Sequence, residues 1–162
     1  MIPEIPGAEH GIDSDGFFAL TEQPKKAAVV GAGYIAVEIA GVFHALGTDT
    51  HLLVRRDRPL RTFDKDITDG LLERMKQDSP ELHTETTVRE VVKQDDGTLT
   101  LHFEGGQTMD GFDCLVWAIG RVPSTDKINL ECTGVELDSE GFINVDKFQN
   151  TNVQGIYAVG DN

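Results

Sequence analysis

Cysteine, tryptophan and tyrosine are scarce in this sequence of 162 residues, which contains two, one and two of them respectively. The cysteines, Cys114 and Cys132, form neither a C-x-x-C pair nor a spacing typical of metal ligands, so the sequence predicts no metal site. Cys114 falls within an apolar strand pattern, where we expect a buried structural thiol.

Long apolar runs and basic residues are also few. The sequence has no signal peptide and no apolar stretch long enough to span a bilayer, which predicts a soluble, cytoplasmic protein without a membrane partner. The 28 acidic and 14 basic residues give a net charge of −14, which argues against nucleic acid and anionic membranes as partners. The length fits one domain, or one domain with part of a second, and it can bury a core without disulfides.

The informative stretch is residues 27–61. An apolar run at 27–30 predicts a strand buried on both faces. A helical pattern follows and ends at Gly47, and a second apolar strand is expected at 51–54. Between the first strand and the helix lie small residues in a G-x-G-x-x-A pattern, namely Gly31, Gly33 and Ala36. This order predicts the first βαβ unit of a dinucleotide-binding fold.

Each small residue of the turn has a task in such a fold. Gly31 permits a tight turn, Gly33 lets the backbone approach a pyrophosphate, and Ala36 keeps the helix close to the strand. The pyrophosphate would rest on free N–H groups at the helix N-terminus. The alternative is an ordinary structural turn, because glycine turns before helices are common.

The end of the second strand bears on which nucleotide binds. NAD-specific sites place Asp or Glu about 20 residues beyond the turn, whereas this chain has Val54 there. Four of the seven arginines follow it, namely Arg55, Arg56, Arg58 and Arg61. Charge-assisted hydrogen bonds contribute roughly 1.5–3 kcal/mol each, so two arginines could favour NADPH over NADH by about a hundredfold. The alternative is a solvated basic loop.

The remaining pattern extends this unit to an α/β fold. A short helix is expected in the stretch S-D-G-F-F, with Phe17, Phe18 and Leu20 on the core, and a second helix is capped by Asp64. That second helix has an apolar face formed by Ile67, Leu71, Leu72 and Met75. Three β-rich runs at 87–93, 99–103 and 107–109 predict an antiparallel meander where a plain Rossmann domain carries a helix.

The last part of the chain changes character after one more buried strand. That strand is expected at 114–119 and is followed by Gly120, at a position that suits the ligand crevice of an open α/β sheet. A glycine that merely ends a strand is the alternative. A boundary is predicted near residues 122–124, and a final strand at 156–159.

The motifs together resemble the pyridine nucleotide-disulfide oxidoreductases. They read VVGAGYIAVE at 29–38, VRRDRPLR at 54–61, WAIGRVP at 117–123 and TNVQGIYAVGD at 151–161. Within this family they are most similar to the flavin-dependent members that reduce glutathione disulfide. The resemblance implies a Rossmann-like NADPH-binding domain with a central parallel sheet and a β-meander crossover, in three layers. It places a connector and short helix at 1–24, the NADPH-binding domain at 25–122, and the truncated start of a central, FAD-contacting domain at 123–162.

The resemblance also implies roles for residues near the glycine turn. Gly31, Ala32, Gly33, Tyr34 and Ile35 resemble the contacts to the pyrophosphate and nicotinamide of NADPH. Tyr34 resembles an aromatic lid over the nicotinamide pocket, with an ordinary tyrosine at the edge of the core as the alternative.

The resemblance also implies roles for charged residues and for residues at the end of the last sheet strand. Arg55 and Arg61 match the pair that holds the 2′-phosphate, with Arg56 adjoining, and Arg58 has no role that the resemblance assigns. Nicotinamide-side contacts match Ile119 and Gly120. The remaining matches are Glu38, which would pair with a lysine of a flavin domain or else lie at a solvent-facing edge, and Asp161, which would bind the ribityl chain of FAD. The five histidines match no catalytic role, and we expect them to be structural or exposed.

The sequence departs from the family by lacking a C-x-x-x-x-C redox pair, a first FAD-binding βαβ unit and a C-terminal His-Glu pair. We therefore expect a piece of a larger homodimeric enzyme, with its flavin and interface domains elsewhere and no turnover by this piece alone. In the parent, NADPH would reduce FAD, and then the cysteine pair and glutathione disulfide. A dihydrolipoamide or trypanothione reductase-like enzyme, and a non-catalytic NADP-binding module, are the alternatives.

Overall fold

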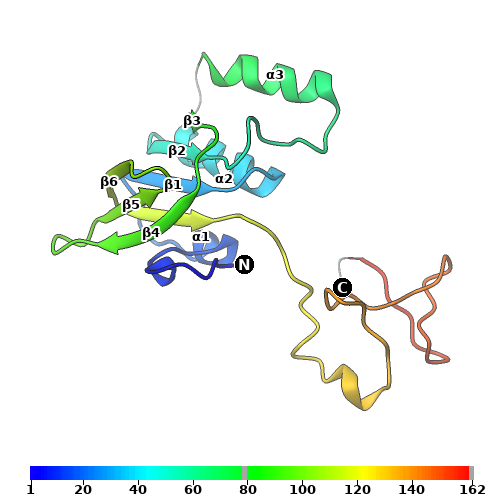
Figure 1. The fold of residues 1–162 in the computed structure, drawn as a ribbon. Coiled ribbons are helices and arrows are strands. Elements are labelled where there is room, and N and C mark those ends of the chain that lie inside the picture. Colours follow the sequence, from blue (N-terminus) through cyan, green and yellow to red (C-terminus); the bar gives the residue numbers. More distant parts are fainter. Residues whose placement is uncertain (78–79, 161–162) are drawn as a thin grey trace. The chain divides into compact units, whose positions relative to one another are not determined.

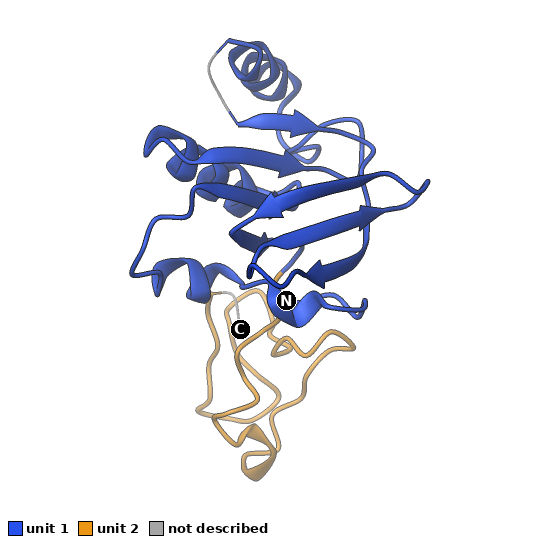
Figure 2. Ribbon diagram, turned by 90° about the vertical axis from the view of Figure 1, so that its left-hand side faces the viewer, with its two compact units in different colours: residues 1–120 blue, residues 121–162 orange. Residues whose placement is uncertain are grey.

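The computed structural model describes residues 1–77 and 80–160 of the chain. They divide into two compact units, one within residues 1–120 and one that begins at residue 121 (Figures 1 and 2).

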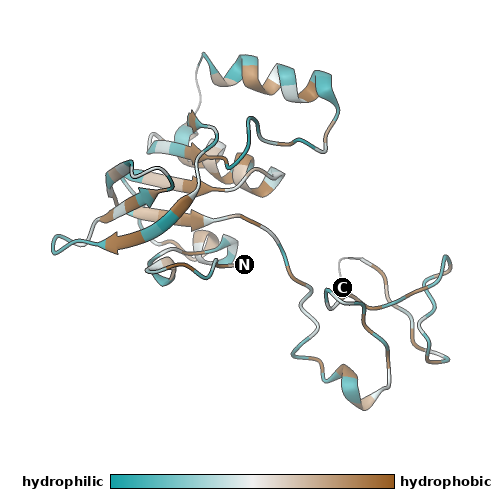
Figure 3. Cartoon of the chain, in the orientation of Figure 1, coloured by the Kyte–Doolittle hydropathy of each residue, from teal (hydrophilic) through white to brown (hydrophobic). Residues whose placement is uncertain are grey.

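A four-stranded parallel sheet forms the centre of the first unit. Its strands are β1 (Lys26–Val30), β2 (Asp49–Leu53), β3 (Glu81–His83) and β7 (Cys114–Trp117), and their order in the sheet is β3-β2-β1-β7. Both neighbours of β1 run parallel to it, as the continuous apolar runs predict for strands that are covered on both faces. Figure 3 shows β1 and β7 in pale to brown, apolar tones.

One face of this sheet is covered by helix α2 (Tyr34–Ala45), which joins β1 to β2. Its buried residues follow helical spacing and are Ala36, Ile39, Ala40 and Phe43. The helix ends as predicted at Gly47, whose φ is 90°, and the N–H groups of Gly47 and Thr48 bond to the carbonyls of His44 and Phe43. This pair of bonds is a Schellman motif, which explains the glycine.

The opposite face is covered by a three-stranded antiparallel sheet formed by β4 (Val88–Lys93), β5 (Leu99–Phe103) and β6 (Thr108–Phe112). This is the predicted meander. Alternate residues of β5 are buried and pack with Leu53 of β2 and Leu115 of β7. The unit is therefore a sandwich of α2, the parallel sheet and the meander, which confirms the predicted α/β fold.

The segment before β1 is attached to the sheet rather than loose. Ile12 forms a parallel bridge with Val116 of β7, and the buried indole of Trp117 donates a 2.9 Å hydrogen bond to the carbonyl of Ala8, in a 3₁₀ turn (Ala8–His10). The predicted short helix is α1 (Ser14–Phe18), capped by Asp13.

The predicted packing of α1 on the core is only partly confirmed. Phe17 packs edge-on against Phe43 of α2, with ring centroids 5.1 Å apart. The other two predictions are wrong, because Phe18 is 81% exposed and Leu20 is 40% exposed. A five-residue helix turns one aromatic residue inward and its neighbour outward.

Helix α3 (Lys65–Met75) begins after Asp64, whose carboxylate accepts a hydrogen bond from Asp66 N–H, as predicted. Its apolar face is less buried than expected. Met75 packs on the α2-side core, but Ile67 at the other end is exposed. Thr68 of the first turn is the one residue of α3 that is buried, so the helix is partly covered along its length and its contacts are not confined to the last turn.

The second unit, as described to residue 160, contains turns, isolated β-bridges and a 3₁₀ turn (Leu130–Cys132). The strand predicted at 156–159 is wrong. Tyr157 forms a single antiparallel bridge with Asn150, and within the described second unit the pairing does not extend to a strand. The assignment of 123–162 to the start of a central domain stays a prediction.

Among the described helices, none combines the length and the apolar character that crossing a membrane requires.

Candidate functional site

The glycine turn after β1 passes very close to the end of β7. A Cβ atom at Gly31 would lie 2.2 Å from the carbonyl oxygen of Ala118 and 3.0 Å from the Cβ of Ala36. The Gly31 N–H donates to the carbonyl of Leu53, with a distance of 3.0 Å. The first glycine and Ala36 are therefore required by packing, because any side chain at residue 31 would push β1, β7 and α2 apart.

The second glycine has a different environment. Gly33 is the N-cap of α2, and a Cβ atom there would meet nothing within 4 Å. No side chain of the described residues caps this helix, and its first turn contains no acidic residue. The N-terminus of a twelve-residue helix thus faces open space, with the partial positive charge of its backbone available to an anion.

The arginine-rich loop after β2 is fixed beside this turn by three backbone hydrogen bonds. Leu60 N–H donates to the carbonyl of Ala32 in the turn, with a distance of 2.7 Å. Glu85 and Thr86, before β4, donate to the carbonyls of Arg56 and Val54 over 3.0 and 3.1 Å. The loop is therefore held to the glycine turn at one end and to the start of the meander at the other.

Two of the four arginines in this loop are already paired with acids. Arg58 donates to Asp69 of α3 over 2.8 Å and lies 3.5 Å from Asp57. The pKa of Asp69 is lowered from its ordinary value by the hydrogen bond from Lys65, and then by that from Arg58. Arg61 lies 3.8 Å from Asp57, and its side chain is 55% exposed. The structure thus gives Arg58 a role that the sequence did not indicate, which is to hold α3.

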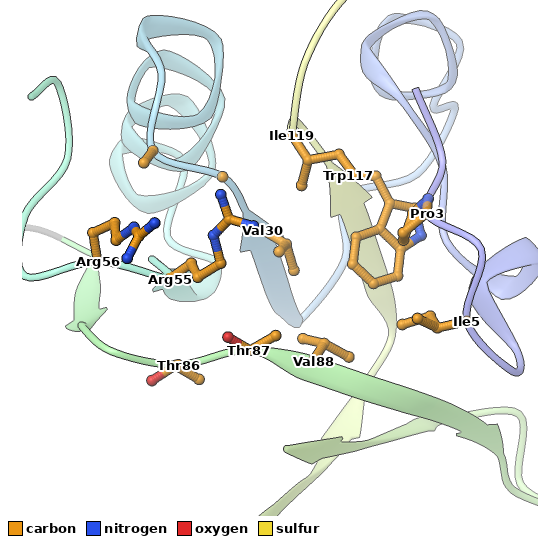
Figure 4. Close-up of a pocket in the computed structure, with 12 residues that line it drawn as sticks. Pro3, Ile5, Val30, Arg55, Arg56, Thr86, Thr87, Val88, Trp117 and Ile119 are labelled. Carbon is orange, nitrogen blue, oxygen red and sulfur yellow. The ribbon is translucent and has the colours of Figure 1, made fainter. Parts of the chain in front are cut away.

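Arg55 and Arg56 have no ion pair with any of the described residues, and both line a cavity of about 380 Å³ (Figure 4). Figure 4 shows the two guanidinium groups at one end of this cavity and Trp117, Pro3 and Ile5 at the other, with Thr86 and Thr87 along the side. The remaining lining residues are Val30, Gly31, Ala32, Val88 and Ile119. The site offers cations at one end and an apolar surface at the other, which suits an amphipathic anion.

The position of the cavity agrees with the topology of the sheet. It lies at the carboxyl ends of β1 and β7, where the strand order β3-β2-β1-β7 changes direction. Open α/β sheets bind ligands in the crevice at such a switch point. Its volume lies within the range of ligand pockets, about 300–1,000 Å³.

The cavity brings together five of the predicted site residues, namely Gly31, Ala32, Arg55, Arg56 and Ile119. The others do not line it. Gly33, Tyr34, Glu38, Arg61 and Gly120 are exposed and Ile35 is half-buried, while Asp161 lies outside the described residues. The roles assigned to all of these residues stay predictions.

Sequence reasoning missed the lining contributed by distant segments. Pro3 and Ile5 belong to the supposed connector, and Thr86 and Thr87 precede β4. No local pattern marks these positions, because their place beside the arginines depends on how the meander and the N-terminal segment pack on the sheet. Trp117 lies in a family-like motif, which is the one signal that could have included it.

The structure confirms the predicted buried thiol of Cys114. Both cysteines are free; Cys114 is buried and Cys132 is exposed. Burial, and secondarily the charge of Asp113, raise the pKa of Cys114 to about 11.

We expect a thiol reagent at pH 8 to modify one cysteine per folded chain and two in denaturant. The thiolate is the reactive form, and a pKa of about 11 leaves only about one Cys114 in a thousand ionised at pH 8. Mass spectrometry of the labelled peptides would check this, with Cys132→Ser as the control that should remain unlabelled until unfolded. Rapid labelling of Cys114 in the folded chain would contradict the buried position.

Comparisons with known proteins agree with the fold and motifs. The family model described as pyridine nucleotide-disulphide oxidoreductase matches residues 1–162. The glutathione reductase of Schizosaccharomyces pombe is 48% identical over 158 residues, and that of Yarrowia lipolytica is 44% identical over 162. These alignments cover 97% and 99% of this chain but 34% of each relative, so the chain spans about a third of their length.

Solved structures share the fold of this chain. The HOCl-induced flavoprotein disulfide reductase RclA of Escherichia coli superimposes with a TM-score of 0.88 at 28% identity, over 99% of this chain and 37% of that one. LpdA of Mycobacterium tuberculosis gives a TM-score of 0.80 at 25% identity, over 93% of this chain and 32% of that one. With a family model that matches its whole length and two curated relatives above 40% identity, this chain belongs to the pyridine nucleotide-disulphide oxidoreductase family.

Proposed function

We propose that this chain is the NADPH-binding part of a flavin-dependent reductase that acts on glutathione disulfide. The observation that carries the proposal is the cavity at the sheet switch point, where Arg55 and Arg56 lie beside the glycine turn without ion partners among the described residues. The similarity to two glutathione reductases over almost the whole chain supports the choice of substrate.

The residues present fit a phosphorylated nucleotide. The open position at Gly33 and the uncapped start of α2 provide a place for the pyrophosphate. The arginines after β2 provide cations for a 2′-phosphate, and the buried face of Trp117 with Ile119 provides apolar contact. When bound, NADPH would supply a hydride to the flavin of the whole enzyme.

This chain's own residues would then bind, select and orient the nucleotide. Arg55, Arg61 and the adjoining Arg56 would select the 2′-phosphate, and the absence of an acid at Val54 removes a group that would repel it. Tyr34, which is 42% exposed, would cover the nicotinamide. We assign Ile35, Ile119 and Gly120 to contacts with the same end of the nucleotide, and Glu38 to a partner lysine.

The other parts of the proposal concern the whole protein. Asp161 would contact FAD, whose site would be completed by a flavin domain, and an interface domain would make the protein a homodimer. These assignments, the division at residues 24 and 122, and a cytoplasmic location stay predictions.

Calorimetric titration of the chain with NADPH and NADH tests the proposal. We expect NADPH to bind about a hundredfold more tightly, because two arginines can form charge-assisted hydrogen bonds with the 2′-phosphate and each is worth about 1.5–3 kcal/mol. Equal affinity, or tighter binding of NADH, would contradict the selectivity and favour an enzyme resembling dihydrolipoamide reductase.

A further inference from the structure

A second group of polar side chains lies on the parallel sheet, outside the cavity described above. His51 of β2 lies next to Glu81 and His83 of β3, since His51 is in register with Glu81 and His83 follows two residues later on the same face of its strand. His51 Nδ1 and His83 Nε2 are 3.0 Å apart. None of these residues lines the nucleotide cavity.

The carboxylate of Glu81 closes a triangle with the two imidazoles. Its Oε2 lies 3.6 Å from His51 Nδ1, and its Oε1 lies 3.5 Å from His83 Nε2. Ligands at 2.0–2.2 Å from a tetrahedral zinc ion are separated from one another by about 3.3–3.6 Å. The two nitrogens are 3.0 Å apart and each lies 3.5–3.6 Å from a different oxygen of the carboxylate, and one ligand atom from each residue lies within 4.8 Å of the others. A rotation of the exposed Glu81 carboxylate would bring one of its oxygens to the distance that such a tetrahedron requires.

The ring of His51 is held in one orientation by its surroundings. Its side chain is 8% exposed, it packs edge-on against Phe112 with centroids 5.3 Å apart, and it stacks on His83. Support of this kind fixes a ligand before the metal arrives. The cluster is thus a preformed arrangement, and not a chance meeting of mobile surface groups.

The surroundings of His51 Nε2 indicate that Nδ1 is the nitrogen that faces the ion. Nε2 is buried and has no hydrogen-bond partner among the described residues, and Asp49 Oδ1 lies 3.4 Å from it. A proton on Nε2 is attracted to that carboxylate, which leaves the lone pair of Nδ1 directed toward His83 and Glu81. Metal-ligating histidines are commonly oriented by a carboxylate on their second nitrogen in this way.

The exposure of the three residues gives an ion a path from solvent. The side chains of His51, His83 and Glu81 are 8%, 23% and 66% exposed. The cluster therefore opens through Glu81, where water could occupy a fourth coordination position.

We propose that His51, His83 and Glu81 bind a divalent transition-metal ion of the zinc type, with Asp49 orienting His51. Two imidazoles and one carboxylate in a tetrahedral arrangement suit Zn²⁺, whereas Mg²⁺ and Ca²⁺ prefer oxygen ligands in larger number. The same parallel sheet would thus carry a nucleotide site at the carboxyl ends of β1 and β7 and a metal site on β2 and β3.

The test is a titration of the chain with Zn²⁺, monitored by competition with a chromophoric chelator. Cys132→Ser should be present in every variant, because this thiol is exposed and could bind zinc by itself. We expect one ion per chain, with binding lost in Glu81→Gln and in His83→Gln. His102→Gln, which changes a half-buried histidine of β5 outside the cluster, should bind like the parent.

Two further measurements separate a ligand from a structural residue. Asp49→Asn should weaken binding by about 10–100-fold without abolishing it, and Co²⁺ should give the intense visible bands of tetrahedral coordination. Glu81 is mostly exposed, so its substitution should leave the fold intact even if a change at buried His51 does not. Binding that persists in both Glu81→Gln and His83→Gln, or no binding by the parent, would overturn the proposal. The short distance between the two imidazoles would then be explained by a hydrogen bond between them.

Discussion

Replacing Arg55 with alanine is expected to weaken NADPH binding by about tenfold to a hundredfold while leaving NADH affinity almost unchanged. Arg55 lines the cavity and has no acidic partner among the described residues, so its full charge is available to a phosphate. Arg61→Ala should have a smaller effect, because Asp57 lies 3.8 Å from its guanidinium and already offsets part of its charge. Calorimetric titration of each variant with both nucleotides measures the difference directly.

Two other arginines provide matched controls. Arg58 belongs to the same loop but is bonded to Asp69, so Arg58→Ala should loosen α3 and leave the ratio of NADPH to NADH affinity unchanged. Arg89 is exposed on β4 and does not line the cavity, so Arg89→Ala removes one positive charge without removing a lining side chain. Equal losses of NADPH affinity in all of these variants would mean that general charge, rather than a 2′-phosphate site, attracts the nucleotide.

Replacing Gly31 with alanine is expected to lower the free energy of unfolding by about 3 kcal/mol or more. The added methyl group would lie 2.2 Å from the carbonyl oxygen of Ala118, and backbone cannot move aside as a flexible side chain can. In a chain of this size the melting temperature should fall by about 6–12 °C. Urea unfolding followed by circular dichroism would measure the change.

Gly33→Ala is the matched comparison, two residues away in the same turn. Nothing lies within 4 Å of the new methyl group, so stability should change by about 1 kcal/mol or less, as for other helix N-cap positions. Nucleotide affinity should nevertheless fall, by about tenfold if one charge-assisted bond to the pyrophosphate is lost. A stable Gly31→Ala protein, or unchanged nucleotide binding by Gly33→Ala, would contradict the division of the turn into a packing glycine and a ligand-facing glycine.

The local elements were predictable from sequence because each depends on neighbouring residues. The strand-turn-helix around residues 27–45, the glycine stop at Gly47 and the cap at Asp64 follow from apolar spacing, from the backbone freedom of glycine and from the carboxylate of aspartate. The prediction of a strand at 156–159 was wrong because a strand depends on residues that are distant in sequence. A strand needs a partner, and the sequence of one segment does not state whether a partner is present.

By itself, the sequence determined the parallel sheet, its meander and the family to which the chain belongs, because motifs of fixed spacing and runs of apolar residues carry that information locally. Only the tertiary structure decided how the four arginines divide between nucleotide cavity and ion pairs, since Arg58 bonds to Asp69 of α3, eleven residues further along the chain, and Arg61 approaches Asp57 within the folded loop. It also decided that the turn's first glycine packs on β7, and that His51 meets Glu81 and His83. The contacts of Gly31 and of His51 join residues separated by 30 to almost 90 positions, and packing alone brings such residues together.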